Sequence, residues 1–229
     1  MAEDFPHVKF IGIDLVPIAT RFPPNNEQFE CYDFLAGPGL QCRDASIDVI
    51  HARYITSGVN DYARLAQESL RALLPGGGFY SAELDFRPEF MTGSNGSVPI
   101  PATREVIRRM MELIPQALPP PSIPLALEAA GFTEVTSKVE WVPIGQWMDT
   151  ERMRTIGETA RSCLFELVDA LRPALLDQAT EVARAVAEGV VEVASKGVDD
   201  LLARARGEIT ALDAKVSMPY HLVHARRPS

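Results

Sequence analysis

Short apolar runs and polar breaks alternate along the first fifty residues. The run 8–14 (VKFIGID) is almost continuously apolar and rich in β-branched residues, which is typical of a strand buried on both faces of a parallel sheet. Two further runs, 29–34 (FECYDF) and 47–53 (IDVIHAR), predict a second and a third strand. The segments between them, 20–28 and 36–46, carry the prolines, glycines or asparagines that predict turns and loops.

The apolar spacing becomes helical after residue 60. In 61–78 leucines and alanines recur at helical intervals, and we expect the helix to end at Pro75 and the three glycines that follow it. The next run, 79–86 (FYSAELDF), predicts a fourth strand. Apolar strands of this kind, joined by a helix, indicate an α/β fold with a parallel, doubly wound sheet.

The second half of the chain is mostly helical in its spacing. A helix is expected over 101–117 and a helix–glycine–strand step over 121–145, and a long helical stretch then runs over 149–212. Within that stretch we expect Pro173 to break or restart the helix and Gly197 to end a segment. The expected organisation is a core (1–148), an inserted helical cap (149–212) and a last core strand with a tail (213–229).

Composition and charge narrow the function classes. The chain has 229 residues, 46% of them apolar, and a net charge of −9 without a long basic run, which argues against nucleic-acid binding. The cysteines Cys31, Cys42 and Cys163 are widely spaced and predict free thiols. His221 and His224 lie three apart in an expected strand and so on opposite faces, and we expect no metal site. Since no apolar run could span a membrane and the N-terminus lacks a signal core, we expect an intracellular protein without a membrane partner.

Two of the expected strands end at a carboxylate. Asp14 ends the first strand, and Asp33 lies at the end of the second. Open α/β sheets bind ligands at the carboxyl ends of their strands, where a carboxylate can accept hydrogen bonds from both hydroxyls of a ribose. The neighbouring ring of Phe34 would suit an adenine. A turn or helix-cap role is the alternative for each acid, but two acidic strand ends in succession are more telling than either one.

The third strand ends in a histidine and an arginine. His51 and Arg53 are candidates for a general base and for a clamp on a substrate carboxylate, with cleft lining or loop anchoring as the alternative. Glu83 and Asp85 share a face of the fourth strand, so a carboxylate pair is conceivable, although we expect only one of them to face the cleft. No nucleophile–His–Asp spacing and no phosphate-loop motif is present, and the sequence assigns no catalytic residue.

Five segments, taken in order, resemble class I S-adenosylmethionine-dependent methyltransferases, and most of all the fungal LaeA-like group associated with secondary metabolism. They extend over nearly the whole chain: FIGIDLVPI, PPNNEQFECYDF, SIDVIHARYITSGVNDYARLAQESLRALLPGGGF, PIGQWMDTERMRTIG and MPYHLVHARRP. The resemblance implies a Rossmann-like sheet, S-adenosylmethionine as the cofactor, and a small-molecule acceptor in a cleft covered by the helical cap. It also implies methyl transfer by proximity and in-line orientation.

The resemblance further implies roles for six residues at the cofactor. It places Asp14, with its neighbour Leu15, at the ribose; Asp33 and Phe34 at the adenine; and His51 and Arg53 at the floor of the pocket near the methionine moiety. It implies no catalytic base that can be placed in this sequence.

The chain departs from the family pattern at its beginning. The family starts with a strand, a glycine-rich DxGxGxG loop and a helix, and the residues before the first expected strand contain none of these. The missing strand normally lies between the strands expected at 8–14 and 47–53, so we expect two exposed strand edges. Three explanations stay open: the natural product starts further upstream, the chain is a shortened and inactive relative, or another chain covers the edges.

The sequence therefore predicts an S-adenosylmethionine-dependent methyltransferase of fungal secondary metabolism. The alternative is a catalytically inactive, methyltransferase-like regulator that binds a protein partner, or a second copy of itself, through the exposed edges. A cofactor-assisted cyclisation or isomerisation on the same fold is a weaker third hypothesis. The expected location is the cytoplasm, with the nucleus as the alternative.

Overall fold

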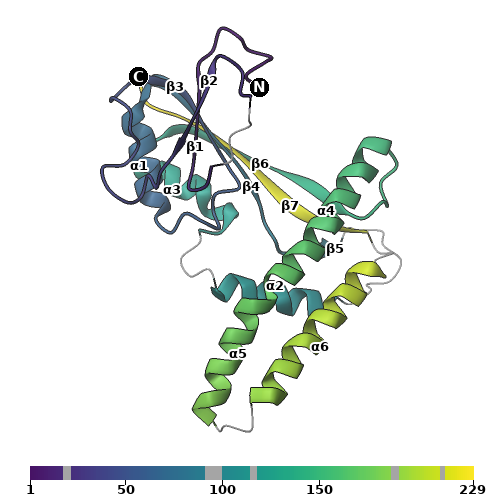
Figure 1. Cartoon of the computed structure of the whole chain (residues 1–229). Coiled ribbons are helices and arrows are strands. Elements are labelled where there is room, and N and C mark those ends of the chain that lie inside the picture. The colour runs from purple at the N-terminus through teal and green to yellow at the C-terminus, as the bar shows by residue number, and fades with distance from the viewer. Residues whose placement is uncertain (18–21, 91–99, 114–117, 187–190, 212–214) are drawn as a thin grey trace.

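A computed structural model describes residues 1–17, 22–90, 100–113, 118–186, 191–211 and 215–229 of the chain. Its strands and the short helices α1 and α3 lie together, and the longer helices α2, α4, α5 and α6 extend away from them (Figure 1). In chain order the elements are β1 (Phe10–Asp14), β2 (Glu27–Cys31), β3 (Ile47–Arg53), α1 (Tyr62–Ala72), β4 (Leu73–Leu84), β5 (Glu89–Phe90), α2 (Pro101–Leu113), η1 (Pro120–Ser122), α3 (Ile123–Ala130), β6 (Thr133–Ile144), α4 (Glu151–Ala170), α5 (Arg172–Val186), α6 (Val191–Thr210) and β7 (Val216–Arg226).

The described strands form two separate sheets. β1 and β2 pair in parallel as a two-stranded sheet, with Asp14 opposite Cys31 at its carboxyl end. The other sheet has the order β3-β4-β7-β5, and β6 also pairs with β7. β3 and β4 are parallel, whereas β5 and β6 run antiparallel to β7 and β7 runs antiparallel to β4. No described strand joins β1 to β3, which agrees with the expected gap between these two strands.

One strand of the larger sheet runs against the others: β7 is antiparallel to β4, β5 and β6, so β6 keeps the direction of β3 and β4. The helices α4, α5 and α6 lie between β6 and β7 in the sequence, and they return the chain to the end of the sheet at which β6 leaves it. Ile144, the last residue of β6, therefore pairs with Val216, the first residue of β7. A strand that re-enters the sheet at that end must run back antiparallel to its neighbour.

Helix α1 ends earlier than its sequence predicts. Its N-cap is Asp61, whose side chain accepts a hydrogen bond from the backbone N–H of Arg64 at 2.9 Å, but the helix stops at Ala72 and β4 begins with the next residue. Pro75 and the glycines therefore belong to a strand. The reason is tertiary: Gly76, at φ +75°, donates its N–H to the carbonyl of Arg227 at 3.0 Å, so the C-terminal segment pairs with this stretch.

Two apolar clusters hold the fold together. One lies between α1, α3 and the sheet of β3, β4 and β7, and contains Phe79, Ile123, Leu127 and Val223. The other lies among α2, α4, α5, α6 and the start of β7. The face of β3 and β4 opposite α1 is open, since Val49 is 55% and Tyr80 42% exposed. The sheet thus has one covered face and one exposed face in this region.

Helices α4, α5 and α6 fall within the stretch that the sequence marks as helical. Pro173 is the second residue of α5, so it restarts a helix as expected. The expected stop at Gly197 was wrong, because α6 continues through it to Thr210 and buries Leu201, Ala205 and Ile209 against the second cluster. The expected cap boundary at residue 212, like the end of the helix expected over 101–117, lies outside the described residues.

Candidate functional site

The small sheet presents two carboxylates at its carboxyl end. Asp14 ends β1, and its Oδ1 accepts a hydrogen bond from the N–H of Val16 at 3.0 Å. Asp33 follows β2 by two residues, and its Oδ1 accepts from the N–H of Leu35 at 2.8 Å. The strands are in register, because the N–H of Tyr32 donates to the carbonyl of Asp14 at 3.1 Å. Each carboxylate uses one oxygen to close its own turn, and no described residue donates a hydrogen bond to the other oxygen.

The neighbours of these acids differ in their surroundings. Leu15 is exposed, whereas Phe34 is half-buried and packs, with Leu35, against the cluster beneath β3 and β4. Arg64 of α1 adds a polar link, since its Nη1 donates to the carbonyl of Leu35 at 2.6 Å. The turn that carries Asp33 is therefore attached to the larger sheet through α1.

His51 and Arg53 lie apart from these four residues, on β3 of the larger sheet. Both side chains are exposed and point to the open face, beside Tyr80 and Ala82 of β4 in the register. Partial burial, and then the nearby charge of Arg53, lower the pKa of His51. No hydrogen bond or ion pair between described residues joins His51 or Arg53 to Asp14 or Asp33. The six predicted residues thus form two groups.

A buried carboxylate at the end of β4 was underestimated from the sequence. Glu83 is 1% exposed, and it accepts hydrogen bonds from the N–H of Ile55 at 3.1 Å, the N–H of Thr56 at 3.3 Å and the Oγ1 of Thr56 at 3.0 Å. Burial raises its pKa against the opposing effect of these donors. An acid within an apolar strand is the sequence signal that points to such an anchor.

Glu83 and Asp85 do not act as a carboxylate pair in this structure. Asp85 is also buried, but its partner is Arg87, whose Nε donates to Oδ1 at 2.8 Å. His221 lies opposite Glu83 in the β4–β7 register, and burial lowers its pKa. His224 lies on the other face, with its ring 4.6 Å from that of Tyr80, so the two histidines are on opposite faces as expected. Each acid therefore has a separate structural partner.

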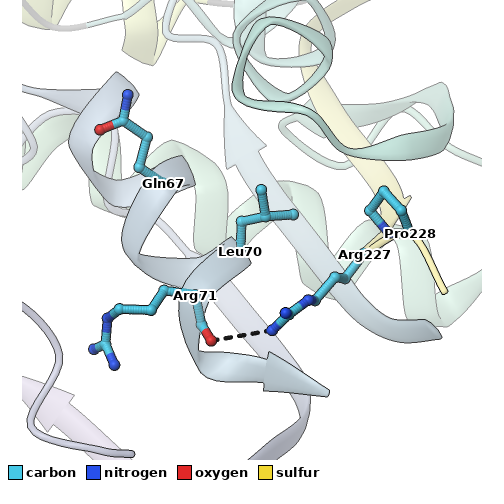
Figure 2. Close-up of a pocket in the computed structure, with 5 residues that line it drawn as sticks. All are labelled: Gln67, Leu70, Arg71, Arg227 and Pro228. Atoms are coloured by element: carbon cyan, nitrogen blue, oxygen red, sulfur yellow. Dashed lines mark hydrogen bonds between the residues drawn. The ribbon is translucent and has the colours of Figure 1, made fainter. Parts of the chain in front are cut away.

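A shallow groove lies beside the C-terminal end of α1. Figure 2 shows its lining residues, Gln67, Leu70, Arg71, Arg227 and Pro228. Arg227 Nη1 donates to the backbone carbonyl of Arg71 at 3.1 Å, whereas the guanidinium of Arg71 points away to Glu68 and Asp44. None of the six predicted residues lines this groove, and its Arg227 is engaged in closing the end of the helix.

Within the described ranges, no helix combines the length and apolar character needed to cross a membrane. Across that same part of the chain, no three side chains of His, Cys, Asp or Glu lie close enough to hold a metal ion.

Comparison with curated proteins finds fungal relatives. The chain is 32% identical over 158 residues to the secondary metabolism regulator laeA of Coprinopsis cinerea, covering 63% of this chain and 38% of that protein. It is 27% identical over 187 residues to methyltransferase pytC of Aspergillus terreus, covering 78% and 55%. It is 26% identical over 181 residues to the protein-methionine methyltransferase laeA of Emericella nidulans, covering 75% and 46%. The chain spans about half the length of these relatives, or less. No family model matches it.

Comparison with solved structures supports the fold. The YcgJ protein of Bacillus subtilis matches with a TM-score of 0.52 and 14% identity, over 100% of this chain and 87% of that one. This match shows a shared mixed α/β fold. The curated relatives support what the sequence motifs indicate: this chain is a relative of the fungal laeA regulators and laeA-like methyltransferases.

Proposed function

We propose that this chain is a methyltransferase that uses S-adenosylmethionine and acts in fungal secondary metabolism. The observation that carries the proposal is the pair Asp14 and Asp33, which lie at or just beyond the carboxyl ends of neighbouring parallel strands, each with one carboxylate oxygen that no described residue bonds. Two such acceptors suit the hydroxyl groups of a ribose and the amino group of an adenine. The two carboxylate acceptors on the small sheet therefore fit the adenosine half of the cofactor.

The roles of the site residues follow from their chemistry. Asp14, beside Leu15, binds the ribose, and Asp33 accepts a hydrogen bond from the adenine while Phe34 borders its ring. His51 and Arg53 border the methionine moiety. When bound, S-adenosylmethionine supplies a methyl group on a positively charged sulfur, which a nucleophilic acceptor can take directly. The protein's own contribution is binding, orientation and exclusion of water.

We further propose the division of labour within the chain. Residues 1–148 form the cofactor-binding core, 149–212 a helical cap over a small-molecule acceptor, and 213–229 the last core strand with its tail. The free thiols of Cys31, Cys42 and Cys163 support a reducing compartment, the cytoplasm or the nucleus.

Isothermal titration of the chain with S-adenosylmethionine and with S-adenosylhomocysteine tests the proposal. Asp14→Asn removes one anionic acceptor without changing the size of the side chain, and we expect cofactor affinity to fall roughly tenfold. Glu30→Gln is the matched control, because Glu30 lies within β2 and not at its carboxyl end. Absence of heat and of any thermal shift for the unmodified chain would sink the proposal.

One observation favours the second candidate, a non-catalytic partner-binding regulator. The N–H of Phe10 and the carbonyl of Asp14 bond to the β2 side, so the backbone of Ile11 and Ile13 faces the free edge of β1. On β3 the N–H of Tyr54 bonds to β4, which leaves the backbone of Val49, His51 and Arg53 at a second free edge. Open edges of this kind accept a strand from another chain or a second copy. Light scattering across a concentration series, with Val49→Lys as the edge variant, tests this candidate.

A further inference from the structure

Tyr54 has a backbone conformation that tyrosine rarely adopts. Its φ is +54°, in the left-handed region where a glycine or an asparagine is the usual residue. It directly follows β3, and its side chain is 56% exposed, so burial of the ring in a core does not explain its presence. A large side chain kept at a strained, exposed position at the carboxyl end of a strand points to a role in binding.

A buried anchor fixes this strained turn. The carboxylate of Glu83 accepts the hydrogen bonds of Ile55 and Thr56, the two residues after Tyr54. On the other side, the N–H of Tyr54 donates to the carbonyl of Ala82 at 3.2 Å. The backbone is therefore held immediately before and immediately after the exposed ring. Glu83 acts as a positioning residue that aims Tyr54.

A second tyrosine completes an aromatic wall. The rings of Tyr54 and Tyr220 have centroids 5.8 Å apart and an interplanar angle of 38°. Tyr220 lies on β7 and is half-buried, and burial together with the neighbouring Tyr54 raises its pKa to about 12. Tyr220 thus remains neutral at physiological pH, and the wall offers ring faces and phenolic hydroxyls.

The wall lies next to a cation. Arg53 makes no ion pair with any described residue, and its charge acts on the phenol of Tyr220. Two neighbouring acids have other partners. Glu83 is buried and bonds Ile55 and Thr56, and Glu140, opposite Tyr220 on β6, pairs with Lys138. An aromatic wall beside an unpaired guanidinium suits a flat ring that carries a negative charge.

We propose that Tyr54, Tyr220 and Arg53 form a binding subsite for a planar aromatic anion, an arene bearing a carboxylate or a phenolate. The inference rests on the proposed function, because it names the class of acceptor for the proposed methyl transfer. The subsite lies at the carboxyl ends of β3 and β4, and Asp14 of the proposed cofactor site likewise lies at the carboxyl end of its own strand, β1.

Binding of 2-naphthoate, followed by its fluorescence, tests the subsite without any turnover. We expect saturable binding that weakens roughly tenfold in Tyr54→Gly, a change that relieves the backbone strain and keeps the fold, and stays within about twofold in Tyr54→Phe. Arg53→Gln should weaken the binding of 2-naphthoate but not the binding of its neutral carboxamide. Cyclohexanecarboxylate, which lacks the flat ring, should bind poorly. Tyr80→Gly is the matched control, an exposed tyrosine of the same sheet whose ring contacts His224 instead.

The outcomes separate this inference from the proposed function. Cofactor titration of the same samples shows whether the adenosine site is intact. Cofactor binding without saturable 2-naphthoate binding, or an equal loss in Tyr54→Gly and Tyr80→Gly, overturns the subsite alone. Binding of 2-naphthoate that depends on Tyr54 and Arg53 supports the subsite. If such a chain does not bind the cofactor, the proposed methyl transfer is overturned and the subsite is not.

Discussion

The carboxylate of Glu208, near the end of α6, accepts a hydrogen bond from the backbone N–H of Thr103 at 2.8 Å, across 105 residues of sequence. The same carboxylate accepts from the N–H of Ala102 at 3.0 Å and from the Oγ1 of Thr103 at 2.8 Å. These two N–H groups lie in the first turn of α2, which begins at Pro101 and has no bonding partners for them within the helix. Glu208 therefore caps α2 from another helix, and its negative charge favours the N-terminus of that helix.

Replacing Glu208 should consequently loosen the packing of α2 on α6. We expect Glu208→Ala to lower the free energy of unfolding by about 1–2 kcal/mol, the usual effect of losing a helix cap. Asp200→Ala, which changes an exposed acid on the same helix, should have an effect within about 0.5 kcal/mol. Urea denaturation of both variants measures the difference. Equal midpoints would contradict the capping role.

The crossing of α4 over the end of β6 depends on a glycine. A Cβ at Gly157 would lie 1.9 Å from the carbonyl oxygen of Gly145, and the N–H of Gly145 donates to the carbonyl of Gly157 at 2.8 Å. We expect Gly157→Ala to destabilise the protein by roughly 2 kcal/mol or more, since backbone must move to accept the methyl group. Thermal unfolding gives the measurement.

Gly207 provides the control for that substitution. It also lies within a helix, but nothing is within 4 Å of the position its Cβ would take. Gly207→Ala should stabilise the protein by up to about 1 kcal/mol through helix propensity alone. If Gly157→Ala and Gly207→Ala shifted the melting temperature in the same direction, the close contact at Gly157 would be refuted.

The pH dependence of stability should carry the signature of Glu83. Burial raises the pKa of this carboxyl in the folded chain above its ordinary value of 4.5. Between pH 4.5 and this raised pKa, the folded chain keeps a proton that the unfolded chain has lost. The contribution of Glu83 to stability therefore falls as the pH rises. Unfolding curves measured from pH 4 upward should show this slope, and Glu83→Gln should remove it.

Glu105 should act in the opposite sense and serves as the comparison. Its hydrogen bonds to Arg108 and Arg109 lower its pKa to about 2. The contribution of Glu105 is therefore present above pH 4.5 and is lost as the pH falls toward 2. Glu105→Gln should flatten the acid limb of the stability profile and lower stability above pH 5 by a constant amount, without changing the slope there. A variant that changes the slope above pH 5 instead would argue against this assignment.

The link between α1 and the turn that carries Asp33 predicts an indirect effect on ligand binding. Arg64 donates to the carbonyls of Leu35 and Gly37 and so fixes the segment after Asp33. If the proposed cofactor site is correct, Arg64→Gln should weaken adenosine binding severalfold, because the carboxylate loses its fixed position. The melting temperature should change little, since the side chain makes only two backbone contacts. Titration calorimetry on the unmodified chain and on Arg64→Gln gives the ratio of their dissociation constants.

Local sequence was sufficient for those features that depend on neighbouring residues. The apolar runs placed β1 and β3, the proline restarted a helix at α5, and the alternation along β7 put His221 and His224 on opposite faces. The resemblance in motifs also identified the group of relatives. These are consequences of period, of local backbone restriction and of short motifs, all of which are present in the linear chain.

The tertiary structure decided what depends on segments far apart. The glycines after Pro75 read as a helix stop, yet they belong to β4 because the chain end at Arg227 pairs with them. Gly197 reads as a helix end, yet α6 passes through it because its apolar stripe is buried on other helices. Glu83 and Asp85 share a face of one strand, but they bond different partners: Glu83 accepts from Thr56 and Asp85 accepts from Arg87. In the first two cases, hydrogen bonds and burial against residues remote in sequence outweighed a local preference of about 1 kcal/mol.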